Sequence, residues 1–122
     1  MELLEKDLTE KIIGACFEVS NELGVGFLES VYEKALIIAL ADKEIDAIAQ
    51  APLKVLFRDK VVGDFYADIL VEDKVIIELK AVKALSPEHE AQIINYLKAT
   101  GIKVGLLINF AKPKLEWKRL VY

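Results

Sequence analysis

At 122 residues, the chain is long enough for one domain with a single core and too short for two. Hydrophobic residues make up 54% of the chain and charged residues 30%, a balance that is typical of a compact globular protein and excludes a disordered one. The formal net charge of −4 argues against a protein whose surface is devoted to the phosphate backbone of free duplex DNA or RNA.

Several further classes are excluded by what the sequence lacks. No apolar stretch approaches the roughly 20 residues of a membrane-spanning helix, and the acidic start Met1-Glu2-Leu3-Leu4-Glu5 does not resemble a signal peptide. We therefore expect a cytoplasmic protein. Cys16 is the single cysteine and lies among apolar residues, so it is expected to be a buried helix residue. There is no Cys/His cluster for structural zinc and no glycine-rich phosphate loop.

The N-terminal part is predicted to form two helices. Thr9 is expected to cap the first helix, whose apolar positions recur at helical spacing until Gly24 or Gly26 ends it. The second helix is predicted over residues 28–41. Its buried side is expected to consist of Val31, Ala35, Leu36, Ile38 and Ala39.

The rest of the chain alternates between predicted strands and one helix. A loop is expected around residues 48–52, followed by strands over 53–58, 61–71 and 74–81, with Pro52 where the first strand begins. Ser86 as a cap and Pro87 in the first turn predict a helix over 87–100 that stops at Gly101. A buried strand is predicted over 104–110 and a last strand over 115–121.

Charged residues interrupt the second and third predicted strands. A turn centred on Asp73 predicts a hairpin in which Asp68 lies opposite Glu78, and side-chain alternation places Lys80 on the same face as Glu78. Directly opposed side chains have Cβ atoms roughly 5 Å apart, a distance at which like charges repel unless a cation lies between them. The sequence therefore predicts a pair of carboxylates with a neighbouring ammonium.

This combination suits metal-assisted hydrolysis of a phosphodiester. Carboxylate oxygens are ligands that Mg²⁺ and Mn²⁺ prefer, and a neighbouring lysine can orient the attacking water or stabilise developing charge. The alternative is a solvated strand face, since the spacing of Asp68, Glu78 and Lys80 also arises by chance in ordinary hairpins.

Two motifs together resemble a known family. Asp68 with Glu78-Leu79-Lys80 resembles the motif of the PD-(D/E)XK nuclease superfamily, and Gly26-Phe27-Leu28-Glu29-Ser30-Val31-Tyr32 matches the GxxExxY signature of a small family within it. Residues 8–15, 22–24, 89–101 and 104–110 also resemble that family, in the same order. One position departs from it, because Ser20 stands where the family commonly has a histidine.

The resemblance implies a fold and a metal site. The implied fold is a restriction-endonuclease-like α/β core, in which helices flank a mixed β-sheet in the order ααβββαβ, with a possible extra C-terminal strand, over residues 1–122. The implied cofactor is Mg²⁺ or Mn²⁺, held by Asp68, Glu78 and Glu29. Lys80 is then expected to position the attacking water or to stabilise the charge of the transition state.

Further side chains are implied as supporting residues. Gln92 and Tyr96 are similar to the QxxxY motif of exonuclease-type members, where the glutamine helps to hold the metal site or the scissile strand. His89 lies one turn earlier and could contact a phosphate or transfer a proton, and Tyr32 shares a helical face with Glu29. The alternatives are that Gln92 and His89 are simply exposed, that Tyr96 packs on the sheet, and that Glu29 only favours the helix dipole.

The function implied by the resemblance is a Mg²⁺-dependent nuclease acting on DNA or RNA, which could need an unknown partner for targeting. One alternative is a binding or regulatory module that kept the fold and lost efficient catalysis, as the acidic charge and Ser20 suggest. Another is a structural homodimer in which the apolar tail, residues 115–122, pairs across a twofold axis through an exposed strand.

Overall fold

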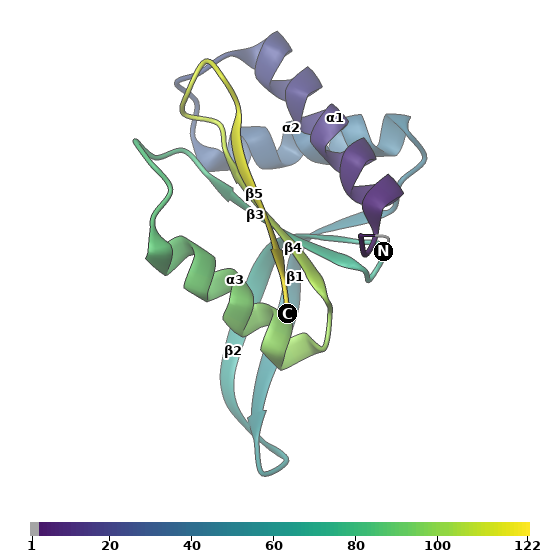
Figure 1. The fold of residues 1–122 in the computed structure, drawn as a ribbon, viewed down its shortest axis with the longest axis vertical. Helices are drawn as coiled ribbons and strands as arrows, with labels where there is room; N and C mark the ends of the chain where they lie inside the picture. The colour runs from purple at the N-terminus through teal and green to yellow at the C-terminus, as the bar shows by residue number, and fades with distance from the viewer. Residues whose placement is uncertain (1–2) are drawn as a thin grey trace.

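The computed structural model describes residues 3–122, so Met1 and Glu2 of the acidic start lie outside the described residues (Figure 1). In chain order the elements are α1 (Lys6–Leu23), α2 (Glu29–Asp42), β1 (Ala47–Phe57), β2 (Lys60–Val71), β3 (Val75–Lys80), α3 (Pro87–Thr100), β4 (Val104–Asn109) and β5 (Glu116–Val121). The predicted order, including the extra C-terminal strand, is confirmed. The helix predicted over 87–100 has the predicted bounds and ends at Gly101 in the left-handed conformation.

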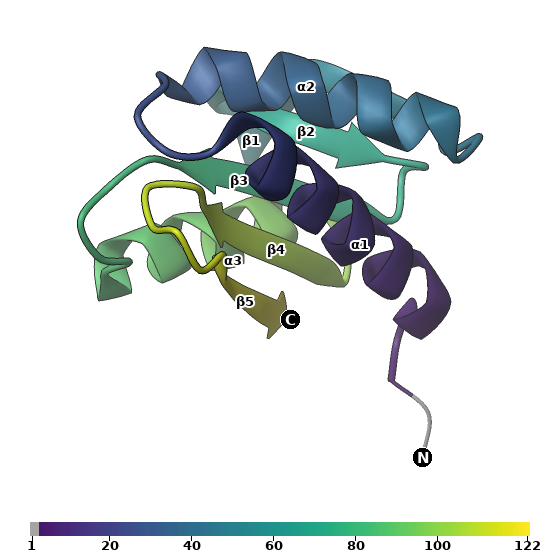
Figure 2. The same ribbon diagram turned by 90° about the horizontal axis from the view of Figure 1, so that it is seen from above.

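The strands form one mixed sheet of five strands in the order β1-β2-β3-β4-β5. Neighbouring strands are antiparallel except β3 and β4, which are parallel and are joined by α3 as a crossover. Figure 2 shows α1 and α2 on one face of the sheet and α3 on the other. Each face has its own hydrophobic core, and β3 and β4 are buried between the two cores.

α1 is the longest helix and begins earlier than expected. Thr9 is not its cap, because the helix starts at Lys6 and the Thr9 hydroxyl donates back to the carbonyl oxygens of Glu5 and Lys6, at 2.9 and 3.0 Å. Cys16 is buried as predicted, and burial raises its pKa to about 12. No helix within residues 3–122 is both long enough and apolar enough to cross a membrane.

The buried side of α2 differs from the predicted one. Tyr32, Leu36 and Leu40 are buried at a spacing of four residues, whereas Val31 and Ile38 are 36% and 64% exposed. The helix is apolar almost all round, so its sequence does not by itself indicate which side meets the sheet.

β1 and β5 form the edges of the sheet, and the sequence had led to a prediction for each of them. β1 begins at Ala47, so the loop predicted around 48–52 is wrong and Pro52 lies inside the strand rather than at its start. Proline is tolerated there because one side of an edge strand pairs with no neighbour. β5 forms the other edge with Trp117 43% exposed, and the homodimer through this tail stays a prediction.

β1 and β2 extend beyond the body of the molecule as a hairpin arm, residues 54–66, which projects downward in Figure 1. Its tip is a turn at Arg58 and Asp59, which both have positive φ angles of 51° and 65°, as a type I′ turn requires. A register shift between Val55 and Leu56 marks a bulge on one side of the arm.

The packing of α3 depends on a glycine in β4. A Cβ atom added at Gly105 would overlap Cγ2 of Ile93, which is fully buried on α3. The helix therefore approaches the sheet to a distance that only glycine permits at this position.

Gly105→Ala should destabilise the protein by about 1 to 3 kcal/mol, because the added methyl group overpacks the α3 core. Gly14→Ala is the matched control: Gly14 lies inside α1 with nothing within 4 Å of an added Cβ, so alanine should stabilise the helix by about 0.5 to 1 kcal/mol. Urea unfolding curves measure both effects. Equal stability of the two variants would contradict the close approach of α3.

Candidate active site

The β2–β3 hairpin has the predicted register. Val71 pairs with Val75 and Ile69 pairs with Ile77, and the ladder ends there, one pair before Asp68 and Glu78. Beyond that point the carboxylate of Asp68 takes the place of a backbone acceptor: its Oδ2 accepts a hydrogen bond of 2.7 Å from the backbone N–H of Leu79. Asp68 is therefore fixed against β3 beside Glu78.

The side-chain alternation of β2 breaks at Asp68. Ala67 belongs to the core under α3, whereas Ile69, two residues later, belongs to the core under α1 and α2. The register places Gln50 of β1 opposite Asp68, and Gln50 has a φ of 53°. Irregularities of this kind bend a strand and redirect a side chain, and they are common next to active sites.

Glu78 is a buried carboxylate with an unpaired oxygen. Its side chain is 4% exposed, and its Oε1 has no hydrogen-bond partner among the residues that the structure describes. The pKa of Glu78 is raised from 4.5 to about 9, chiefly by burial and also by the hydrogen bond and negative charge of Asp68, while the positive charge of Lys80 opposes the shift. The three predicted residues therefore lie together as predicted.

This carboxylate pair fits a divalent cation. A buried oxygen without a partner is costly, and hard oxygen donors with net negative charge are what Mg²⁺ or Mn²⁺ requires. Within residues 3–122, no three His, Cys, Asp or Glu side chains are grouped closely enough to hold a metal ion by themselves. Glu29 is thus outside a preformed group with Asp68 and Glu78, and its role as a metal ligand stays a prediction.

Glu29 nevertheless reaches the same end of the sheet. It is the first residue of α2, and its Oε2 accepts a hydrogen bond of 3.3 Å from the backbone N–H of Ala81, which follows Lys80. The glutamate of the GxxExxY segment is therefore brought next to the lysine of the hairpin, although the two residues lie far apart in the sequence.

Tyr32 holds the turn that positions Glu29. Its hydroxyl donates a hydrogen bond of 2.7 Å to the carbonyl of Gly24 and accepts one of 3.3 Å from the N–H of Phe27. Its ring stacks on Phe110 with centroids 4.6 Å apart. Gly26, with a φ of 105°, provides the turn between these contacts. Gly26 and Tyr32 therefore fix the start of α2.

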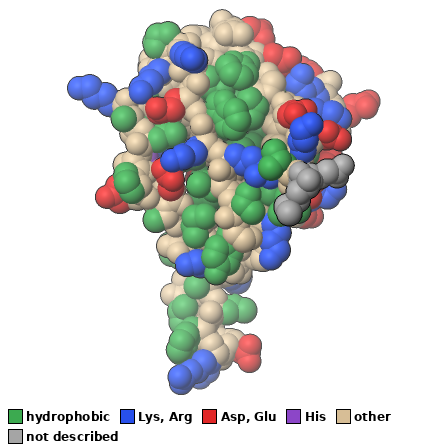
Figure 3. Space-filling view, in the orientation of Figure 1, with side chains coloured by type: hydrophobic (Ala, Val, Ile, Leu, Met, Phe, Trp, Pro, Cys, Tyr) green, Lys and Arg blue, Asp and Glu red, His purple; other side chains and the backbone are tan. Residues whose placement is uncertain are grey.

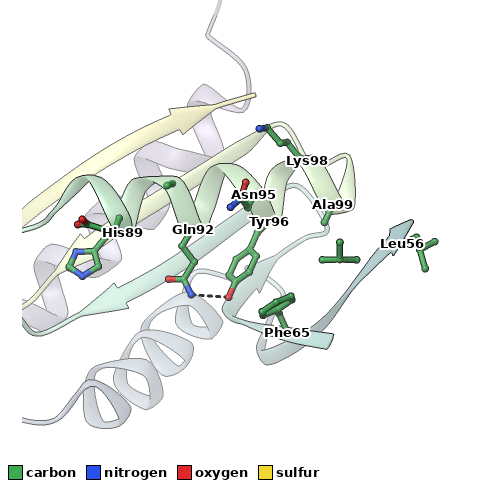
Figure 4. Close-up of a pocket in the computed structure, with 11 residues that line it drawn as sticks. Leu56, Phe65, His89, Gln92, Asn95, Tyr96, Lys98 and Ala99 are labelled. Carbon is green, nitrogen blue, oxygen red and sulfur yellow. Dashed lines mark hydrogen bonds between the residues drawn. The ribbon is translucent and has the colours of Figure 1, made fainter. Parts of the chain in front are cut away.

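α3 brings a polar pair to the carboxylates. Gln92 donates a hydrogen bond of 3.0 Å from Nε2 to the hydroxyl of Tyr96, as the dashed line in Figure 4 marks. Burial raises the pKa of Tyr96, and the charges of Glu78 and Asp68 raise it further. The ring packs in the same core as Ala67, which precedes Asp68. Gln92 is exposed and Tyr96 packs on the sheet, as the alternative interpretation expected.

His89 has a structural contact at the start of α3. Its Nδ1 accepts a hydrogen bond of 3.1 Å from the backbone N–H of Ser86, which completes a capping box. The side chain is half-buried rather than freely exposed. A contact between His89 and a phosphate stays a prediction. It would involve Nε2, because Nδ1 already accepts from Ser86.

Comparison with known proteins identifies the family. The model of the PD-(D/E)XK nuclease superfamily matches residues 6–120. The chain belongs to this superfamily. Nucleases of the superfamily typically use divalent metal ions. No curated protein is detectably similar to the chain.

The solved structure of one protein shares the fold of this PD-(D/E)XK chain. The crystal structure of SSO0001 superposes on it with a TM-score of 0.60 at 18% sequence identity, over 96% of this chain and 58% of SSO0001. The chain thus spans a little over half the length of SSO0001. The similarity confirms the restriction-endonuclease-like α/β fold.

One residue next to the candidate site was not predicted from the sequence. Asn109, fully buried at the end of β4, accepts from the N–H of Val82 at 3.1 Å and donates to its carbonyl at 2.8 Å and to Glu116 Oε1 at 3.1 Å. It thereby holds the segment that follows Lys80. The available signal was a polar residue at the end of the apolar run 104–108.

A groove lies between the arm and α3 (Figure 4). Its volume is about 890 Å³, and Tyr96 and Gln92 line it on the side of α3. Phe65 lines it on the side of the arm, with its ring centroid 5.9 Å from that of Tyr96. The sequence analysis missed Phe65, because it did not predict that the arm folds toward α3.

Glu78→Gln should stabilise the metal-free protein at alkaline pH. Because folding raises the pKa of Glu78 from 4.5 to about 9, its contribution to stability is full below about pH 4.5 and is lost as the pH rises to about 9. Glutamine does not ionise, so the variant should be more stable at pH 8 by on the order of 5 kcal/mol. Urea unfolding in EDTA between pH 5 and pH 8 measures the difference.

The control is Glu72→Gln, in the exposed turn of the same hairpin. The stability of this variant should decrease between pH 5 and pH 8 by the same amount as that of the wild type. If the stability of Glu78→Gln falls as steeply with rising pH as that of the wild type, ionisation of Glu78 is not the cause of the fall.

Proposed function

We propose that the chain is a nuclease of the GxxExxY type that hydrolyses phosphodiester bonds of DNA or RNA with Mg²⁺ or Mn²⁺. The observation that carries the proposal is the buried, unpaired Oε1 of Glu78 beside Asp68, on the strand that also presents Lys80. Membership of the PD-(D/E)XK nuclease superfamily supports nuclease activity.

Asp68 and Glu78 are the residues that would hold the metal, with Glu29 as a further ligand from α2. A divalent ion bound there polarises the scissile phosphate and makes a bound water more acidic. The N–H of Leu79 fixes the orientation of the Asp68 carboxylate by its 2.7 Å hydrogen bond. Asp68 is thus held in place before any ligand binds.

Lys80 supplies the positive charge of the site. It follows Glu78 by two residues on β3 and acts electrostatically on that carboxylate. An ammonium at this position orients the attacking water and stabilises the negative charge that develops on the phosphate. Gln92, held by Tyr96, presents an amide that steadies the scissile strand.

A binding or regulatory module without efficient catalysis is the second candidate. The observation that favours it is Ser20, which stands where the family commonly has a histidine. Ser20 is 8% exposed on α1, and its carbonyl accepts a hydrogen bond of 2.9 Å from the N–H of Gly24. Metal binding without cleavage of any substrate would favour this function.

Asp68→Asn and Lys80→Ala should each reduce Mg²⁺-dependent cleavage by about 10²-fold or more, since each removes a charged group that acts on the reacting phosphate. Asparagine retains an oxygen that can accept from Leu79, so the fold should survive. Cleavage of labelled single-stranded and duplex DNA and RNA measures activity. Titration calorimetry with Mn²⁺ should show loss of metal binding in Asp68→Asn.

The matched control is Asp64→Asn. Asp64 lies on the same strand, but it is exposed and pairs with Lys54 at 3.9 Å on the arm. Its replacement should leave cleavage within twofold of wild type. Undiminished cleavage by Asp68→Asn and Lys80→Ala would rule out the proposed site.

A further inference from the structure

The arm groove lies on the α3 face of the sheet, the face toward which alternation along β3 directs Glu78. Tyr96 links the groove to β3, because its ring lines the groove and packs in the same core as Ile76, two residues before Glu78. Figure 4 shows Gln92 and Tyr96 on α3 facing Phe65 across the groove. A polymer lying in the groove would therefore lie on the same face of the sheet as Glu78.

The ring of Phe65 presents an exposed aromatic face. A Cβ atom at Gly63 would lie 2.7 Å from Cε2 of Phe65, so the ring lies flat along the arm over a position that only glycine leaves free. Phe65 is 45% exposed, and its ring is tilted by 46° to that of Tyr96. An open ring face of this kind is available to a flat ligand, such as an unpaired base.

The charge of the arm differs from that of the whole chain. Residues 54–66 contain three basic side chains and two acidic ones, a net charge of +1, whereas the chain as a whole carries −4. Figure 3 shows hydrophobic side chains along the projecting arm and Lys and Arg side chains at its end. The α3 side of the groove includes Lys98 and Glu88, and Nζ of Lys98 lies over the ring of Tyr122, 5.3 Å from its centroid. The region provides a few phosphate contacts rather than a broad basic face.

This balance favours an unpaired strand over a duplex. A duplex presents mainly phosphates, so its binding depends on many cations and the release of many counterions. Proteins that bind single strands combine fewer backbone contacts with aromatic rings on which bases stack. The groove has two aromatic rings, Phe65 and Tyr96, and its lining includes one lysine and one glutamate, so it lacks a broad basic face among the residues that line it.

We propose that the arm groove binds a single-stranded segment of nucleic acid, with a base stacked on Phe65 and phosphates near the basic side chains of the arm. The strand then leads a phosphodiester to Asp68 and Glu78. This inference rests on the proposed function and adds to it the class of substrate: unpaired DNA or RNA.

The test is fluorescence anisotropy of labelled oligothymidylate, and of its duplex with oligoadenylate, in EDTA so that cleavage does not occur. The single strand should bind at least tenfold more tightly than the duplex. Phe65→Ala should weaken single-strand binding about fivefold or more, the loss expected for one stacked base. Phe65→Leu, which keeps an apolar side chain against Tyr96 for folding, should lose binding similarly.

The matched control is Tyr66→Ala. Tyr66 is the next residue on β2 and 59% exposed, but alternation directs it to the other face and it does not line the groove. Its replacement should leave affinity within twofold of wild type. Equal affinities of the Phe65 and Tyr66 variants, or duplex binding as tight as single-strand binding, would overturn the inference. So would dimerisation of the wild type that Phe65→Ala abolishes in sedimentation, which would assign the arm to contact with a second copy.

Cleavage assays on the same variants separate this inference from the proposed function. If wild type cleaves, Asp68→Asn does not, and the Phe65 variants bind like wild type, the nuclease stands and the groove inference fails. If nothing is cleaved but binding of the single strand depends on Phe65, the groove inference holds as a binding site and the proposed hydrolysis fails.

Discussion

The carboxylate of Glu78 is the constraint on which the rest of the site depends. It lies in a strand that is buried between two hydrophobic cores, where a polar oxygen without a hydrogen-bond partner lowers stability. The fold accommodates it locally: the β2–β3 ladder ends beside it, and Asp68 bonds to the backbone in place of the next pair. Burial of the apolar residues in both cores offsets the stability that is lost by burying Glu78.

The site combines local and distant contributions. Asp68, Glu78 and Lys80 belong to one hairpin, so a short stretch of chain brings them together. Glu29 and Gln92 come from helices on opposite faces of the sheet. These helices reach the same end of the sheet because each starts or passes where β3 ends, and Asn109 holds the segment between β3 and α3 in place.

The features that could be predicted from the sequence are those that depend on residues close together in the chain. The hairpin register followed from alternation about a turn, and the bounds of α3 followed from Ser86, Pro87 and Gly101. What the sequence did not predict depends on tertiary contacts. Pro52 is tolerated within β1 because β1 is an edge strand. The hydrogen bonds of His89 to Ser86 and of Asn109 to Val82 join groups that meet only when the chain folds.

The arm lies outside both cores, and this determines how it can move. Its apolar residues near the tip, Leu56, Phe57, Val61 and Val62, are about half or more exposed, at 59%, 58%, 49% and 64%, so few buried contacts hold that end. Segments of this kind fray and close again without global unfolding, and their amide hydrogens exchange accordingly. One wall of the groove can therefore move and admit or release a long chain in its middle, while β3, the strand that carries Glu78, keeps its place between the two cores.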